Sequence, residues 1–186
     1  MKVFTVVKLL VQPVGPIDRG LLRWLTEELE SRFPIALRAR YSLWPLSMDY
    51  SRVFDWARMQ FNALAVNQVI HETFKDMVKP RESLVVGLVA GDGYVEGLNF
   101  VFGLATPELS VATVYTSRLE SRDVALYQAR VLKEVMHEVG HLLGLNHCGN
   151  RRCVMSFSNS VAEVDAKEAW FCPACTAKLK SLSGSI

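Results

Sequence analysis

Residues 137–147 read H-E-V-G-H-L-L-G-L-N-H, at the end of an apolar pattern that predicts a helix. Positions four apart differ by only about 40° around a helix, so His137 and His141 project from one face and can bind one metal ion. Glu138 is next to that face, where its carboxylate can reach a water at the metal without being a ligand itself.

The third histidine of this stretch requires the helix to end. Six residues beyond His141, a continuing helix would carry His147 about 240° around the axis, to the far side. Gly144 lies between them and readily adopts the left-handed conformation that ends helices. We therefore expect the chain to turn back after Leu143, so that three imidazoles bind one zinc ion and leave one coordination position open, the catalytic arrangement. With Glu138 as general base, this chemistry is hydrolysis of a peptide or similar amide.

A less specific interpretation of the same residues also exists. A bare H-E-x-x-H pattern arises by chance, in which case Glu138 is a solvated helix residue and Gly144 an ordinary helix end. The added Gly144 and His147, preceded by an amphipathic helix, favour the zinc site.

All four cysteines fall in the last 39 residues of the 186-residue chain. Cys148 and Cys153 form one short-spaced pair, and Cys172 and Cys175 form another, close to the spacing of a four-cysteine zinc site. Four thiolates leave no open position, so we expect a structural zinc that supplies folding free energy to a tail with few apolar residues. The alternative is a thiol-redox pair at Cys172 and Cys175, although no strand is predicted before Cys172.

Upstream, apolar periodicity predicts alternating strands and helices. We expect strands at residues 3–10, 36–43, 84–90, 99–104 and 111–117. We expect helices after the caps Asp18 and Asp123, from about Asn62 to before Pro80, and at 174–182. The length predicts a single domain, residues 1–186, with an α/β part at 1–144 and a small C-terminal part at 145–186.

Composition excludes several classes of protein. A net charge of +2 with interspersed signs argues against nucleic acid as a partner. Apolar runs such as 84–90 are far shorter than the roughly 18 residues that suggest a membrane span. Lys8 interrupts the apolar N-terminal stretch, so we expect no signal peptide. These features predict a cytoplasmic protein with no membrane or nucleic-acid partner, and we also expect a monomer.

The motifs together resemble the archaemetzincin family of metzincin zinc metalloproteases. The family signature is similar to H-E-x-x-H-x-x-G-x-x-H-C-x4-C-x-M followed by C-x-x-C, and the last gap here differs by one residue. Every named position is filled, by His137, Glu138, His141, Gly144, His147, Cys148, Cys153, Met155, Cys172 and Cys175. The segment 97–103, G-L-N-F-V-F-G, also resembles the family.

The resemblance implies a fold of the α+β or α/β class, a metzincin-like twisted mixed β-sheet with an active-site helix and a small zinc-stabilised C-terminal subdomain. It implies an aminopeptidase-like metallopeptidase with two zinc ions and a peptide or protein substrate. Met155 would form a methionine turn beneath the catalytic zinc and, with Gly144, support the site. Asn99, Phe100, Val101, Phe102 and Gly103 would form an edge strand that pairs with extended substrate, or a strand with a purely structural role. A zinc-stabilised peptide-binding protein with little or no turnover is the alternative from another class.

Overall fold

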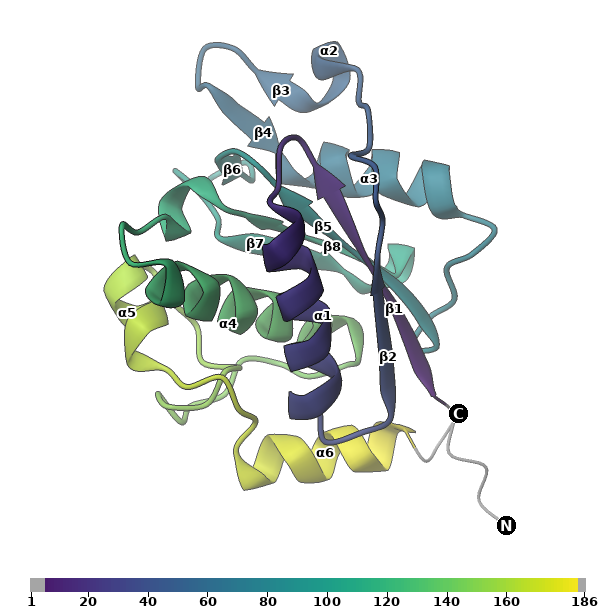
Figure 1. Cartoon of the computed structure of the whole chain (residues 1–186), viewed down its shortest axis with the longest axis vertical. Coiled ribbons are helices and arrows are strands. Elements are labelled where there is room, and N and C mark those ends of the chain that lie inside the picture. Colours follow the sequence, from purple (N-terminus) through teal and green to yellow (C-terminus); the bar gives the residue numbers. More distant parts are fainter. Residues whose placement is uncertain (1–5, 184–186) are drawn as a thin grey trace.

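The computed structural model describes residues 6–183, so the first residues of the strand expected at 3–10 lie outside the described part. Five strands form the main sheet, in the order β2-β1-β5-β8-β7 (Figure 1). They are β1 (Val7–Val14), β2 (Leu37–Tyr41), β5 (Ser83–Val89), β7 (Gly103–Thr106) and β8 (Val111–Tyr115). The first four in this order are parallel, whereas β7 runs antiparallel to β8 at the edge, which makes the sheet mixed.

Helices cover both faces of this sheet. Helices α1 (Arg19–Arg32) and α4 (Val124–Leu142) pack on one face, and α3 (Ala63–Phe74) packs on the other (Figure 1). The side chains of β5 alternate between the two faces: Leu84, Val86 and Leu88 join the core with α1 and α4, and Val85 and Val89 join the core with α3. A strand buried on both sides is apolar throughout, which explains why 84–90 reads as one hydrophobic run.

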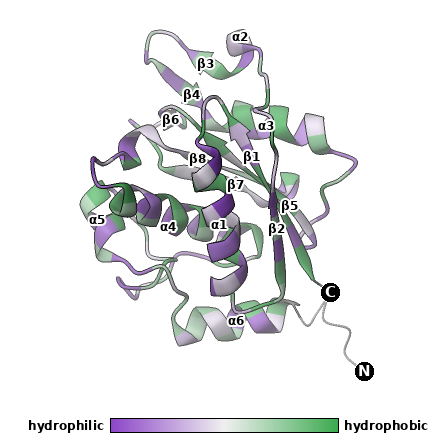
Figure 2. Cartoon of the chain, viewed as in Figure 1, coloured by the Kyte–Doolittle hydropathy of each residue, from purple (hydrophilic) through white to green (hydrophobic). Residues whose placement is uncertain are grey.

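Side-chain caps start the three main helices where the sequence predicts them. Asp18 accepts a hydrogen bond from the Leu21 amide, and Asn62 caps α3. Asp123 caps α4 by accepting from the amides of Ala125 and Leu126. Hydrophilic and hydrophobic bands alternate along α4 (Figure 2), yet its second half is buried almost completely between the sheet and the C-terminal region.

Two expected strands are shifted along the chain. The first extends through Pro13 to Val14. Because β2 ends at Tyr41 opposite Val11, β5 is the only strand that pairs with the last residues of β1, where a proline is tolerated. The strand expected at 99–104 is instead β7, Gly103–Thr106.

A second, smaller sheet forms where the sequence predicts a loop and a turn. It consists of β3 (Phe54–Asp55), β4 (Gln60–Asn62) and β6 (Gly93–Tyr94), and the short helix α2 (Tyr50–Val53) precedes it. Two further 3₁₀ turns, Pro107–Leu109 and Ser117–Leu119, flank β8.

The C-terminal region contains α5 (Val161–Ala166), which the sequence does not predict, and α6 (Pro173–Ser183), which it does. Its apolar side chains, among them Met155, Phe171 and Leu179, belong to the same core cluster as α1 and α4. None of the helices in residues 6–183 is long and apolar enough to cross a membrane.

Candidate metal and active site

The end of α4 directs the chain back toward its own histidines. Gly144 has a φ of +97°, a left-handed conformation that costs glycine little. The Leu145 amide donates to the Gly140 carbonyl and the Gly144 amide donates to the His141 carbonyl, both at 2.9 Å. This pair of bonds is a Schellman motif, which satisfies the last carbonyls of the helix and turns the chain sharply.

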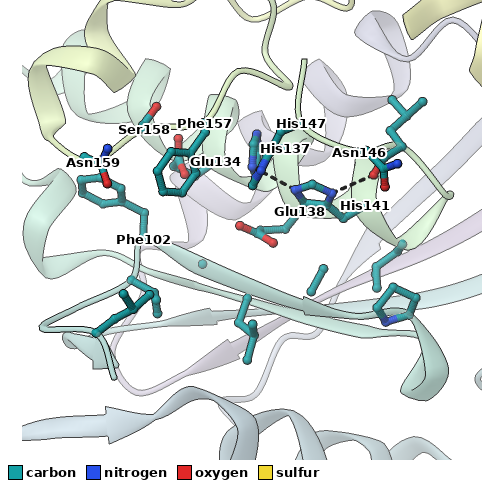
Figure 3. Close-up of a pocket in the computed structure, with 18 of the residues that line it drawn as sticks. Phe102, Glu134, His137, Glu138, His141, Asn146, His147, Phe157, Ser158 and Asn159 are labelled. Carbon is teal, nitrogen blue, oxygen red and sulfur yellow. Dashed lines mark hydrogen bonds between the residues drawn. The ribbon is translucent and has the colours of Figure 1, made fainter. Parts of the chain in front are cut away.

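After this turn, His147 lies beside the two histidines of the helix (Figure 3). The three ring centroids are 4.6 to 5.2 Å apart, and the candidate ligand atoms all lie within 4.8 Å of one another. His137 is buried, His141 is half-buried and His147 is exposed. The three rings therefore converge at the floor of an open cleft.

Hydrogen bonds to carbonyl oxygens fix which ring nitrogens are free. Nδ1 of His137 lies 2.8 Å from the Val154 carbonyl oxygen, and Nδ1 of His141 lies 2.8 Å from that of Leu145. A carbonyl oxygen only accepts, so each Nδ1 carries the proton and each neutral ring has its Nε2 lone pair free. Burial lowers the pKa of all three histidines, most strongly that of His137, which favours this neutral form.

The free nitrogens have the spacing of metal ligands. Nε2 of His137 lies 3.1 Å from Nε2 of His141, where two lone pairs repel unless a cation lies between them. Two nitrogens on a tetrahedral zinc, each at about 2.0–2.1 Å, are about 3.3 Å apart. The histidine set therefore fits a zinc ion in distance and in protonation.

Glu138 is buried next to this histidine set. Burial, together with the nearby negative charge of Glu134, raises the pKa of Glu138 to about 8. Its carboxyl group packs against Gly103, where a Cβ atom would lie 2.6 Å from Glu138 Oε1. A glycine at this position of β7 therefore leaves the space that the carboxylate occupies.

The four cysteines form a second cluster, with Sγ atoms within 4.8 Å of one another. Sγ of Cys148 lies 3.7 Å from Sγ of Cys172, well beyond disulfide length and close to the roughly 3.8 Å between two thiolates on a tetrahedral zinc. Burial raises the pKa of Cys153 and Cys175. Burial acts the same way on Cys172, but hydrogen bonds from Cys175 and the neighbouring thiols outweigh it and lower its pKa to about 7. At this spacing all four can be thiolates only around a cation, and the spacing fits zinc.

Met155 and the residue before it contact both clusters. It is fully buried, and its sulfur packs directly on Gly140, so closely that a Cβ atom there would overlap it. The Met155 carbonyl accepts a hydrogen bond from the Cys148 amide at 2.9 Å, and the preceding residue, Val154, accepts from His137. The segment that carries Met155 thus contacts both clusters.

A cavity of about 660 Å³ opens over the histidines and Glu138. Its rim is the segment 98–105, opposite α4, and its far wall includes Phe157, Ser158 and Asn159. Phe157 packs against the His147 ring with centroids 5.0 Å apart. In Figure 3 these wall residues lie on one side of the histidines and Asn146 lies on the other. The cleft therefore extends beyond the histidines in both directions.

Comparison with known proteins shows which family this chain belongs to. The family model for peptidase family M54 matches residues 39–181. The chain belongs to peptidase family M54. It is 54% identical over 149 residues to the archaemetzincin of Aeropyrum pernix, covering 77% of this chain and 80% of that protein. It is 37% identical to the archaemetzincin of Pyrococcus furiosus, covering 95% and 94%.

Solved archaemetzincin structures share the fold. The Methanopyrus kandleri protein gives a TM-score of 0.79 at 32% identity, over 96% of each chain. The Archaeoglobus fulgidus protein, complexed with malonate, gives 0.74 at 34% identity, over 92% of this chain and 99% of that one. The resemblance to archaemetzincins and the mixed α/β fold are confirmed. As a member of this family, the chain is a zinc metallopeptidase, a hydrolase that acts on peptide or protein substrates.

At the rim of the cleft, the strand begins later in the chain than expected. Of residues 99–103, only Gly103 belongs to β7; Asn99, Phe100, Val101 and Phe102 precede the strand and are held by other contacts. The Val101 amide donates to the Gly93 carbonyl at 2.8 Å, and the Phe102 carbonyl accepts from the Tyr115 amide at 2.8 Å. All five residues line the cleft.

Three residues near the site were not predicted from the sequence. Glu134 and Lys167 line the cleft as a buried ion pair, 2.8 Å apart. Glu134 shares a helix face with Glu138, four residues on, so its position could have been inferred; Lys167, 33 residues away, has no such signal. Gly140 occupies an unspecified position of H-E-x-x-H, and only its contact with Met155 shows why a glycine fits there.

Proposed function

We propose that His137, His141 and His147 bind the catalytic zinc of this peptidase, and that Glu138 is the general base for hydrolysis of a peptide bond. The observation that carries this proposal is the convergence of two free Nε2 lone pairs at 3.1 Å, beside a buried carboxylate. When bound, zinc supplies Lewis acidity, which acidifies water and polarises a carbonyl group.

Glu138 has the position and the protonation chemistry for a base. Its carboxyl group is buried at the cleft, where the raised pKa of about 8 lies close to neutral pH, as suits a group that both accepts and delivers a proton. It accepts the proton of the attacking water and then delivers that proton to the leaving amine. Gly103, at the cleft rim, leaves the space that this carboxylate occupies.

The cysteine cluster has a structural role in this proposal. Cys148, Cys153, Cys172 and Cys175 bind a second zinc ion and leave no open position for chemistry. Because Cys148 directly follows His147, this zinc also fixes the third histidine from behind, as Met155 does from below. Residues 145–186 then form a zinc-stabilised subdomain of a metzincin-like fold, joined to 1–144.

The substrate binds in extended form along the rim. Strand β7 is the edge of the main sheet, and an extended peptide can pair with such an edge. We infer that Gly103 and the preceding residues 99–102 contact the substrate backbone or side chains. An aminopeptidase-like specificity, a monomeric state and a cytoplasmic location remain predictions.

A peptide library tests this function. Wild-type protein should cleave peptides of diverse sequence, and Glu138→Gln should bind as much zinc but lose activity by at least about a hundredfold. Comparing each cleaved peptide with its N-terminally acetylated form tests the aminopeptidase-like specificity, since acetylation should abolish cleavage only in that case. A zinc-loaded wild-type protein that binds but cleaves no peptide would favour a peptide-binding protein. A titratable Cys172–Cys175 dithiol without zinc would favour redox chemistry.

A further inference from the structure

Polar side chains in and near the second sheet form hydrogen bonds to the rim of the cleft. Arg58, in the turn between β3 and β4, donates to the carbonyl oxygens of Leu98 and Asn99 at 3.0 and 3.1 Å. Gln60, in β4, donates to the Asn99 carbonyl at 2.9 Å and to Asp92 Oδ2 at 2.9 Å. These bonds connect the rim to a sheet that contributes no candidate catalytic residue.

Arg118 completes this network. Its guanidinium group donates two hydrogen bonds to Asp92, from Nε to Oδ1 at 2.8 Å and from Nη2 to Oδ2 at 2.7 Å. Such a two-pronged charge-assisted pair fixes the plane of the guanidinium group. The Asp92 hydrogen bonds also raise the pKa of Arg118, whose guanidinium group is charged at any physiological pH.

The oriented guanidinium group lies on an aromatic ring of the rim. Its Cζ atom is 4.1 Å from the centroid of Phe100, a cation–π distance. Phe100 in turn packs edge-to-face with Phe102, with centroids 5.2 Å apart and planes at 74°. Both rings line the cleft opposite α4. A charged pair that does not itself line the cleft therefore packs against one ring of the apolar rim.

We propose that Arg118 and Asp92 are positioning residues that hold Phe100 as a substrate-contacting wall, and that they set the affinity for an extended peptide with an apolar side chain facing the rim. This inference rests on the proposed function. Loss of the pair lets the rim move, so substrate binds more weakly, while the histidines and Glu138, held by α4 and the C-terminal region, keep their places.

Amide hydrogen exchange and steady-state kinetics test this directly. Arg118→Met should speed exchange in 98–103 but not in 134–142, and should raise KM for the best library peptide about tenfold while kcat stays within about twofold. Asp92→Asn should act in the same direction, and Arg118→Lys should recover part of the loss. Arg23→Met is the matched control, because it removes an exposed pair with Glu27 on α1. All variants should keep the wild-type zinc content.

Unchanged exchange at 98–103, or a fall in kcat with KM unchanged, would overturn the inference. A wild-type protein that cleaves no peptide would contradict the proposed function instead. The exchange measurement would then still decide whether Arg118 holds the rim.

Discussion

The ammonium group of Lys167 lies 2.8 Å from Glu134 Oε1, and only 1% and 4% of the two side chains are exposed. Lys167 also lies 3.4 Å from the Ser156 carbonyl oxygen, next to Met155. A buried ion pair thus connects the helix that carries His137 to the segment beneath it.

Removing one charge of this pair should destabilise the protein strongly. Lys167→Met leaves Glu134 buried without a counter-charge, which we expect to lower the free energy of unfolding by about 3–5 kcal/mol in urea denaturation. The double variant Lys167→Met/Glu134→Leu should recover most of this loss, because no charge is left unpaired. Additive losses in the double variant would show that the two side chains do not interact.

Gly140→Ala should also destabilise the protein, although alanine favours helices by about 1 kcal/mol over glycine. The new methyl group would overlap the sulfur of Met155, which is fully buried. We expect a net loss of about 1–2 kcal/mol from overpacking. Gly149→Ala is the matched control, since a Cβ there meets nothing within 4 Å and its stability should be unchanged. Equal stabilities for the two variants would contradict the close packing of Met155.

The Arg130–Asp165 pair should make stability depend on pH in the acid range. Hydrogen bonds from Arg130, at 2.7 Å to each carboxylate oxygen, hold the pKa of Asp165 below its ordinary value of 3.8. A lowered folded-state pKa adds stability above the ordinary pKa, and that stability is lost as pH falls through the folded value. The stability difference between wild type and Asp165→Asn should therefore be constant near neutral pH and shrink below about pH 4. The exposed Asp76→Asn serves as control.

Substitution of single ligands should distinguish the histidine zinc site from the cysteine zinc site. His147→Ala should reduce zinc from two ions per chain to one, while Cys172→Ser should remove the other and lower the melting temperature more, because it loosens the C-terminal region. His71→Ala should keep both ions, since His71 contacts the Leu109 carbonyl on the far face of the sheet. Loss of zinc in His71→Ala would refute this assignment of ligands.

Local patterns predicted the parts of the site that depend on a few neighbouring residues. The cap Asp123, the apolar stripe of α4 and the glycine at 144 act within one turn of the chain, so helix, histidine pair and reversal follow from sequence spacing. The clustering of the four cysteines follows from the spacing within the two pairs, although the 18 residues between Cys153 and Cys172 contain α5, which the sequence does not predict.

Contacts between distant residues were not predictable in this way. Strands of two or three residues, such as β3 and β6, are too short to show periodicity. The segment 99–104 reads as a strand from its apolar residues, but Arg58 and Gln60 bond to the Asn99 carbonyl and strand pairing with β8 begins only at Gly103. The Glu134–Lys167 pair likewise depends on how the C-terminal region folds back on α4.

An anomalous-difference map at the zinc absorption edge, from crystals of the wild-type protein, tests the central claim most directly. We predict two peaks: one bonded to Nε2 of both His137 and His141 and to the His147 ring, beside Glu138, and one among the four cysteine sulfurs. A single peak at the cysteines, with the His147 ring turned away from the other two, would contradict the account.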